Sequence, residues 1–226
     1  MSRMAVLFLM IIAPALSICL ALLGLETLRA NLLGWFLLLL GIGFPAGGII
    51  YYWIRREPFW RSAQVGETVL EERGDRSFWA ILPGFLVVFF APPLEFTYLP
   101  AILPHAFWMQ WAGLAILVLS LALRVWARVH IRGMYSGHVE VQVEHTLVQS
   151  GPYRFVRHPG YTGLVLMSLG VALGYSSLIG LLAIPALLIP GLAYRMAVEE
   201  KLLARHFGDE YRTYAGKTKR LIPFIW

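Results

Sequence analysis

The sequence predicts an all-α integral membrane protein, and three observations point to this class. Of the 226 residues, 58% are hydrophobic and only 14% are charged, whereas an ordinary soluble domain carries about a quarter charged residues. The mean hydropathy is +0.67. Apolar runs of about 20 residues, the length that crosses a bilayer as a helix, recur along the chain. Together these features exclude an ordinary soluble domain.

Five apolar runs set the expected spans. Four of them have the length of a single span, and they are 4–25, 31–54, 78–99 and 107–129. The fifth run, 161–198, is nearly twice as long, and we expect Tyr175-Ser176-Ser177 to break it into a hairpin of two helices. The prediction is therefore about six transmembrane helices, followed by an amphipathic C-terminal helix. The apolar flank of that last helix carries Leu202, Leu203 and Phe207.

The basic residues indicate how these spans are oriented. With the amino terminus inside, all of the 19 Lys and Arg residues except Arg29 fall at cytoplasmic ends, which is a strong positive-inside bias. We therefore expect both termini and any site near residues 145–161 to be cytoplasmic. Anchoring to anionic lipids accounts for the formal net charge of +6, so the charge does not indicate nucleic acid as a partner. The 55–76 loop on that face either covers a site or lies on the headgroups.

A polar segment, HTLVQSGPYRFVRHPGY at 145–161, interrupts the apolar pattern. Pro159 suits the first turn of a helix, where its missing N–H would be unpaired in any case. His158 precedes a proline and is biased toward an extended backbone. A helix that begins here would present free N–H groups to an anionic or hydroxyl-bearing ligand, and Ser150-Gly151-Pro152 is a turn signal. These features predict a compact, ligand-holding loop that leads into the fifth span.

A second polar cluster, RMAVEE at 195–200, ends the sixth span. Arg195 and Glu199 are four residues apart and share one helix face, while Glu200 is turned away by about 100°. A short hairpin would bring this pair beside RHPGY. Simpler readings stay open: Arg195 as positive-inside anchoring, His145 and His158 as polar caps, and Glu200 as the solvated start of the tail.

The spacing of these motifs resembles one known family. HTLV-x-S-G-x-Y, RHP-x-Y, R-x3-EE-x2-L and FG-x-EY occur in this order, as in the isoprenylcysteine carboxyl methyltransferases, which are membrane enzymes that use S-adenosylmethionine. The resemblance covers residues 138–223. It implies one integrated domain with a four-helix membrane region, 1–129, and a cofactor-binding and catalytic region, 130–226.

The resemblance also implies roles for individual residues. Those expected to hold S-adenosylmethionine, the HTLV residues mainly by their backbone, are Gln142, His145, Thr146, Leu147, Val148, Tyr153, His158, Pro159, Gly160, Tyr161 and Glu199. Arg195 would meet the methyl acceptor, and Arg195 with Glu199 would form the catalytic pair. The acceptor would be lipid-like or a small molecule. A carboxylate needs no base, whereas an amine or thiol would need Glu200 or a His. No metal site is expected, and Cys19 alone cannot form a disulfide framework.

Three other functions compete with this interpretation. A phospholipid amine or small thiol or amine methyltransferase would use a similar cofactor segment. A sterol-reductase-like enzyme that uses NADPH resembles the RHP-x-Y turn, but Arg195, Glu199 and the FGDEY sequence favour the methyltransferase. A membrane scaffold or transporter would not need a polar cluster at one face. We expect Glu95, which follows a double proline, to lie at the opposite interface.

Overall fold

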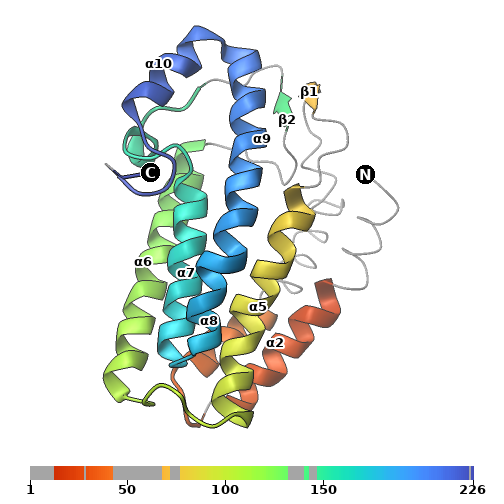
Figure 1. Cartoon of the computed structure of the whole chain (residues 1–226), viewed down its shortest axis with the longest axis vertical. Coiled ribbons are helices and arrows are strands. Elements are labelled where there is room, and N and C mark those ends of the chain that lie inside the picture. Colours follow the sequence, from red (N-terminus) through yellow and green to blue (C-terminus); the bar gives the residue numbers. More distant parts are fainter. Residues whose placement is uncertain are drawn as a thin grey trace.

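The computed structural model describes residues 13–27, 29–42, 68–71, 77–131, 140–142, 147–223 and 225–226. In this part of the chain, helices form a bundle, and one small strand pair lies at its end (Figure 1). Three helices are long and apolar enough to cross a membrane, and they are α5 (Ser77–Tyr98), α6 (Phe107–Ile131) and the continuous helix Leu178–Phe207. Shorter apolar helices are α2 (Ala13–Thr27), Leu33–Ile42 and α7 (Pro159–Gly174). The all-α membrane class is confirmed.

The predicted hairpin in the long apolar run is confirmed in detail. Helix α7 ends at Gly174, and the chain turns through Ser176, which has a φ of 52°. The Ser177 side chain caps the next helix by accepting a hydrogen bond from Gly180 N at 2.8 Å. The turn is thus formed by Ser176, whose backbone is in the left-handed region, and by Ser177, which is the N-cap of the next helix. Of the first two expected spans, residues 4–12 and 43–54 lie outside the described residues.

The helix after this turn is continuous but not uniform. It consists of α8 (Leu178–Ala183), a π-helical segment, η3 (Ile184–Leu188), and α9 (Ile189–Phe207). The π segment contains Pro185, which has no N–H to donate and whose ring would clash with a carbonyl in a regular helix. A single π turn accommodates such a residue without ending the helix.

Glycines allow the close approach of α6 and α7. The spacing of Gly170 and Gly174 is typical of tightly packed membrane helices. A Cβ built on Gly113 of α6 would lie 2.6 Å from both Gly170 O and Gly174 Cα, so the two backbones touch at this level. The buried core lies around this contact and against α5, α8 and α9, and its fully buried members include Val88, Phe89, Leu117, Val171, Leu188 and Leu192.

Glu95, which the sequence places at the interface opposite the polar motifs, lies near the end of α5, and its side chain is buried. Its carboxylate accepts hydrogen bonds from the Ser177 hydroxyl and from the N–H groups of Leu178 and Ile179, the latter two at 3.1 Å. These are donors that the first turn of a helix leaves unpaired. Glu95 therefore joins α5 to the start of α8, inside the bundle.

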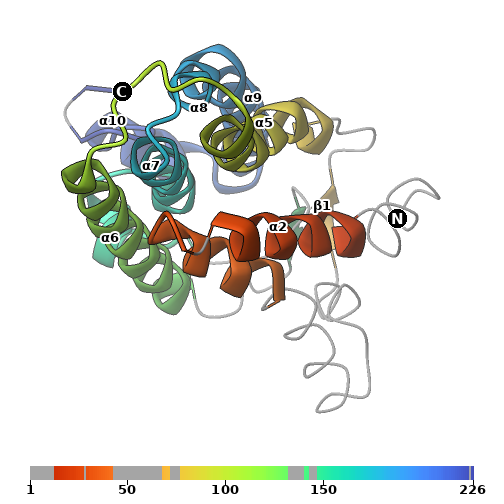
Figure 2. The same ribbon diagram turned by 90° about the horizontal axis from the view of Figure 1, so that it is seen from below.

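The opposite end of the bundle collects the remaining elements (Figure 1). Strands β1 (Thr68–Glu71) and β2 (Glu140–Gln142) form an antiparallel pair there, with Thr68 opposite Gln142. Helix α10 (Asp209–Lys217) and the C-terminal residues lie at the same end, next to the start of α7. Seen from below, α2 runs along the side of the bundle that α5, α7 and α8 form (Figure 2). The polar motifs therefore meet at one end.

Candidate active site

The RHPGY turn starts helix α7 as the sequence predicts. Pro159 is the first helical residue, and His158 has φ −124° and ψ 60°, outside the helical region. The His158 carbonyl accepts from Tyr161 N and Thr162 N, both at 3.0 Å. The proline fixes where the helix begins, and this places His158 and Tyr161 on either side of its first turn.

The C-terminal segment runs alongside this turn and binds to its backbone. Val156 and Lys219 form a parallel β-bridge. Arg157 N donates to Lys219 O at 2.7 Å, and His158 N donates to Arg220 O at 3.1 Å. Residues 218–221, which we call the C-terminal strap, thus satisfy N–H groups in front of α7 that would otherwise lack an intrahelical partner. The shape of the turn depends on a segment some 60 residues away.

Glu200 lies at the centre of a charged cluster with a side chain that is only 13% exposed. Its carboxylate is 2.9 Å from Arg157 Nε, 2.8 Å from Arg220 Nη2 and 3.3 Å from His158 Nε2. Arg157 also donates through Nη1 to the carbonyls of Ala215 and Thr218. The reading of Glu200 as a solvated start of the tail is therefore wrong: this carboxylate joins α9, the RHPGY turn and the C-terminal strap.

Arg195 and Glu199 form the second cluster, one helical turn earlier on α9. Arg195 Nε lies 3.0 Å from Glu199 Oε1 and 2.7 Å from Tyr161 Oη, and the Tyr161 hydroxyl also donates to Glu199. Arg195 is buried, with 9% of its surface exposed. The predicted geometry is confirmed, because Arg195 and Glu199 share a helix face and meet the RHPGY turn at Tyr161. Glu200 faces a different part of that turn, at Arg157 and His158. His158 bridges the clusters, since its other nitrogen, Nδ1, is 3.5 Å from Glu199.

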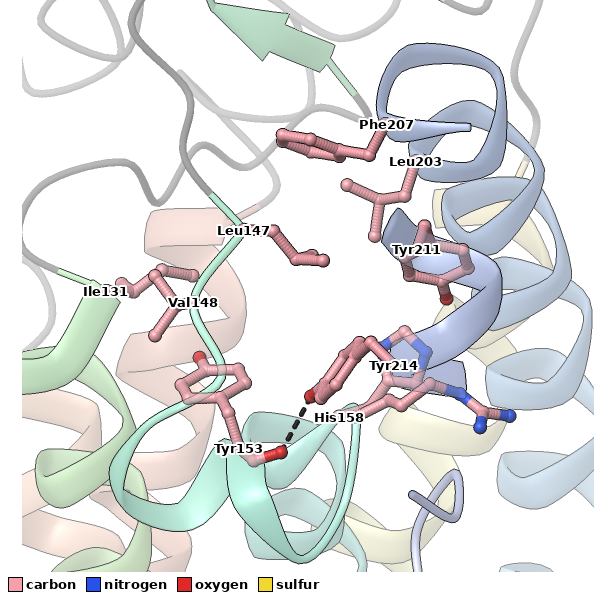
Figure 3. Close-up of a pocket in the computed structure, with 10 residues that line it drawn as sticks. Ile131, Leu147, Val148, Tyr153, His158, Leu203, Phe207, Tyr211 and Tyr214 are labelled. Carbon is pink, nitrogen blue, oxygen red and sulfur yellow. Dashed lines mark hydrogen bonds between the residues drawn. The ribbon is translucent and has the colours of Figure 1, made fainter. Parts of the chain in front are cut away.

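A cavity opens beside these clusters (Figure 3). Its lining residues come from the end of α6, the segment before α7, α9 and α10, and they are Ile131, Leu147, Val148, Tyr153, Arg157, His158, Leu203, Phe207, Tyr211 and Tyr214. Leu147, Val148 and Tyr153 lie on one side of the cavity, and Leu203, Phe207 and Tyr211 lie across from them. Most of the wall is apolar or aromatic, and polar atoms enter it at the side of His158 and the tyrosines.

Tyr214 fixes one wall of this cavity. It is 5% exposed, and its hydroxyl donates to the Tyr153 carbonyl at 2.7 Å, the bond drawn in Figure 3. Burial raises the pKa of Tyr214 to about 12, so the phenol keeps its proton at neutral pH. The bond therefore holds α10 against the segment that carries Leu147 and Val148.

The structure separates the predicted cofactor residues into groups. Leu147, Val148, Tyr153 and His158 line the cavity. Pro159 is buried at the helix start, and the Gly160 carbonyl accepts from Arg124 Nη1 at 3.1 Å. Tyr161, Arg195 and Glu199 lie in the adjoining charged cluster instead of the cavity wall. Gln142 is in β2, while His145 and Thr146 lie outside the described residues.

Several residues of the site did not emerge from the sequence. Leu203 and Phe207 belong to the R-x3-EE-x2-L and FG-x-EY motifs and to the apolar flank of the last helix, but no role in the site was assigned to them, although their spacing places both on one face. Tyr211 belongs to the FG-x-EY motif without an assigned role. Nothing near Arg157, the first residue of RHP-x-Y, or near Arg220 indicates that they pair with Glu200, because Glu200 comes from a distant part of the chain.

Parts of this chain match known proteins. Residues 108–210 match a family model described as phospholipid methyltransferase. The chain is 28% identical over 133 residues to protein-S-isoprenylcysteine O-methyltransferase B of Arabidopsis thaliana, covering 58% of this chain and 67% of the relative. It is 32% identical to the protein-S-isoprenylcysteine O-methyltransferase of Schizosaccharomyces pombe, over 51% of this chain and 50% of that relative. It is also 32% identical to the protein of the same name from Homo sapiens, over 52% of this chain and 42% of that relative.

A solved structure has the same fold over nearly the whole chain. It is a eukaryotic intramembrane Ras methyltransferase, isoprenylcysteine carboxyl methyltransferase, with a TM-score of 0.57 and 21% identity, and the match covers 93% of this chain and 75% of that one. The proteins that this chain matches in sequence and in fold are thus membrane methyltransferases. Its sequence is similar to isoprenylcysteine O-methyltransferases, and its fold is similar to that of an isoprenylcysteine carboxyl methyltransferase, in agreement with the resemblance in its motifs. The matched regions span about half to two thirds of several curated relatives.

Proposed function

We propose that this protein transfers a methyl group from S-adenosylmethionine to the carboxylate of a lipophilic acceptor of the prenylated-cysteine type. The observation that carries the proposal is the juxtaposition of two features. The Arg195 and Glu199 pair meets the RHPGY turn, and His158 of that turn faces the cavity. The names of the relatives support the same acceptor class.

The chemistry of the cavity wall fits an adenosine cofactor. Apolar side chains from two sides, Leu147 and Val148 against Leu203 and Phe207, suit a flat aromatic base. The polar atoms near His158 and Tyr153 suit the sugar and amino-acid parts. When bound, S-adenosylmethionine supplies an electrophilic methyl group on a sulfonium centre. The protein must then position the two reactants and exclude water.

Arg195 is the residue we assign to the acceptor. A carboxylate is ionised at neutral pH and needs no base, so a guanidinium that orients it is sufficient. Glu199 and Tyr161 hold the guanidinium from its Nε side. They restrict its rotamers, and they offset part of its charge within the membrane.

We infer that this site faces the cytoplasm. The observation behind this orientation is the basic residues at the end that carries the site, which include Arg157, Lys217, Lys219 and Arg220. Anionic lipids of the cytoplasmic leaflet attract such an end. A water-soluble cofactor would enter from that side, and a lipophilic acceptor would arrive from the bilayer between helices.

A phospholipid amine is the second candidate acceptor, because the matching family model is described as phospholipid methyltransferase. An amine must lose a proton before it attacks. Glu200 is poorly suited as that base, since the guanidinium groups of Arg157 and Arg220 stabilise its anion. This argument favours the carboxylate.

Methylation with two acceptors tests the proposal. Purified protein in detergent would receive radiolabelled S-adenosylmethionine and either a farnesylated cysteine or phosphatidylethanolamine. We expect label in the farnesylated cysteine only, and release of that label as methanol in base, because methyl esters hydrolyse and N-methyl groups do not. Label that enters phosphatidylethanolamine and resists base would support the alternative. Thermal stabilisation by NADPH, but not by S-adenosylhomocysteine, would contradict both.

Arg195 variants test its assigned role. Arg195→Ala and Arg195→Lys should retain S-adenosylhomocysteine binding within a few-fold, because Arg195 does not line the cavity. Transfer should fall about 100-fold or more in Arg195→Ala, since the acceptor loses its orientation. Arg212→Ala, on the exposed face of α10, is the matched control and should be fully active. Full turnover by Arg195→Ala would show that the assignment is wrong.

A further inference from the structure

The hydroxyl of Tyr211 is a buried polar group in the wall of the cavity. Tyr211 belongs to α10 and is 4% exposed. Its Oη has no hydrogen-bond partner among the described residues. Buried hydroxyl groups in native proteins are nearly always paired. An unpaired one that lines a cavity is a position where a bound molecule supplies the partner.

Tyr214 provides an internal comparison on the same helix. Its ring centroid lies 6.2 Å from that of Tyr211, and it is equally buried and lines the same cavity. Its hydroxyl, however, donates to the Tyr153 carbonyl. Tyr214 therefore fastens α10 to the opposite wall, whereas the Tyr211 hydroxyl makes no hydrogen bond within the described part of the chain (Figure 3).

The surroundings of Tyr211 indicate what kind of atom it would bind. Burial raises the pKa of Tyr211 above its ordinary value, so the phenol remains protonated and can donate. Arg157, the cation of the cavity wall, is already paired with Glu200, which favours a neutral acceptor over a carboxylate. Leu203 and Phe207 lie next to Tyr211 and offer an apolar surface to an aromatic base.

We propose that Tyr211 is a cofactor-binding residue whose hydroxyl donates a hydrogen bond to the nucleoside part of the methyl donor, at a ring nitrogen or a hydroxyl oxygen. This inference rests on the proposed function. It adds a specific contact from α10 to a cavity that the HTLV and RHPGY segments line from the other side.

Removing only the hydroxyl tests the inference. In the full-length protein in detergent, Tyr211→Phe should leave the melting temperature of the ligand-free protein unchanged or raise it, because an unpaired buried hydroxyl is lost. The same variant should bind S-adenosylhomocysteine about five- to tenfold more weakly. Tyr214→Phe, the matched control, should lower the melting temperature, because it loses a bond that the folded protein makes. A residue with a purely structural role would not separate the two measurements in this way.

A second ligand locates the contact. 5′-Methylthioadenosine has the nucleoside but lacks the amino-acid part, so Tyr211→Phe should weaken its binding by the same factor. A loss confined to S-adenosylhomocysteine would overturn the nucleoside assignment. Equal affinities of the wild type and Tyr211→Phe for S-adenosylhomocysteine would overturn the inference alone. Absence of S-adenosylhomocysteine binding by the wild type would overturn the proposed function, and the inference with it.

Discussion

Truncation of Glu200 should destabilise the end of the bundle that carries the site. Glu200→Ala leaves Arg157 and Arg220 without their common anion. Breaking a fully buried ion pair costs about 3 to 5 kcal/mol, while an exposed pair contributes about 0 to 1 kcal/mol. The side chains here are intermediate: Glu200 and Arg157 are each 13% exposed, and Arg220 is 32% exposed.

The expected cost lies between these limits. Arg157 keeps two carbonyl acceptors, at 2.7 and 2.6 Å, and water reaches Arg220, so we expect a loss of about 2 kcal/mol. For a chain of this size, that loss lowers the melting temperature by roughly 4 to 8 °C. Thermal unfolding in detergent measures it. Arg212→Ala removes an exposed pair, 75% and 92% exposed, and should change stability by less than about 0.5 kcal/mol. A Glu200→Ala shift no larger than that of this control would refute the reasoning.

Two further predictions concern packing and the buried carboxylate. Gly113→Ala should destabilise the protein by about 1 to 3 kcal/mol, because the added Cβ would lie 2.6 Å from atoms of Gly170 and Gly174. Gly216→Ala is the control, because nothing lies within 4 Å of a Cβ at that position. It should be neutral or stabilising by up to about 1 kcal/mol. Melting curves of the two variants would contradict this if they shifted alike. Glu95→Ala should lower the free energy of unfolding by about 1 to 3 kcal/mol, since it leaves helix N–H groups and a serine hydroxyl unpaired. A melting temperature equal to that of the wild type would contradict this prediction and show that water replaces the carboxylate.

Local signals explain which parts of the fold could be predicted. Apolar run length located α5 and α6 to within about two residues. The proline in RHPGY fixed the first residue of α7, and the Tyr175-Ser176-Ser177 sequence fixed the hairpin turn. Each of these features depends on residues within one or two turns of the helix concerned. The pairing of Arg195 with Glu199 was predictable for the same reason.

Contacts between distant segments could not be predicted in this way. Nothing near Arg220 indicates that it reaches Glu200, or that the C-terminal strap binds the backbone before α7. The place of Glu95 after a double proline, near the end of an apolar run, predicts a carboxylate at the interface but does not predict its burial. The donors that compensate it, at the start of α8, lie more than 80 residues further along the chain. One-dimensional patterns reveal the polar groups but not their partners.

The π-helical segment at Ile184–Leu188 determines which way the charged end of the last span faces. A π turn holds one residue more than an α turn, and each residue of an α-helix advances the side-chain direction by about 100°. A deletion of one residue here would leave the length and hydropathy of the span almost unchanged. It would nevertheless rotate Arg195 and Glu199 by about 100° away from Tyr161. The irregular π turn within the span therefore sets the direction in which Arg195 and Glu199 point, and so determines whether they reach Tyr161 at the site.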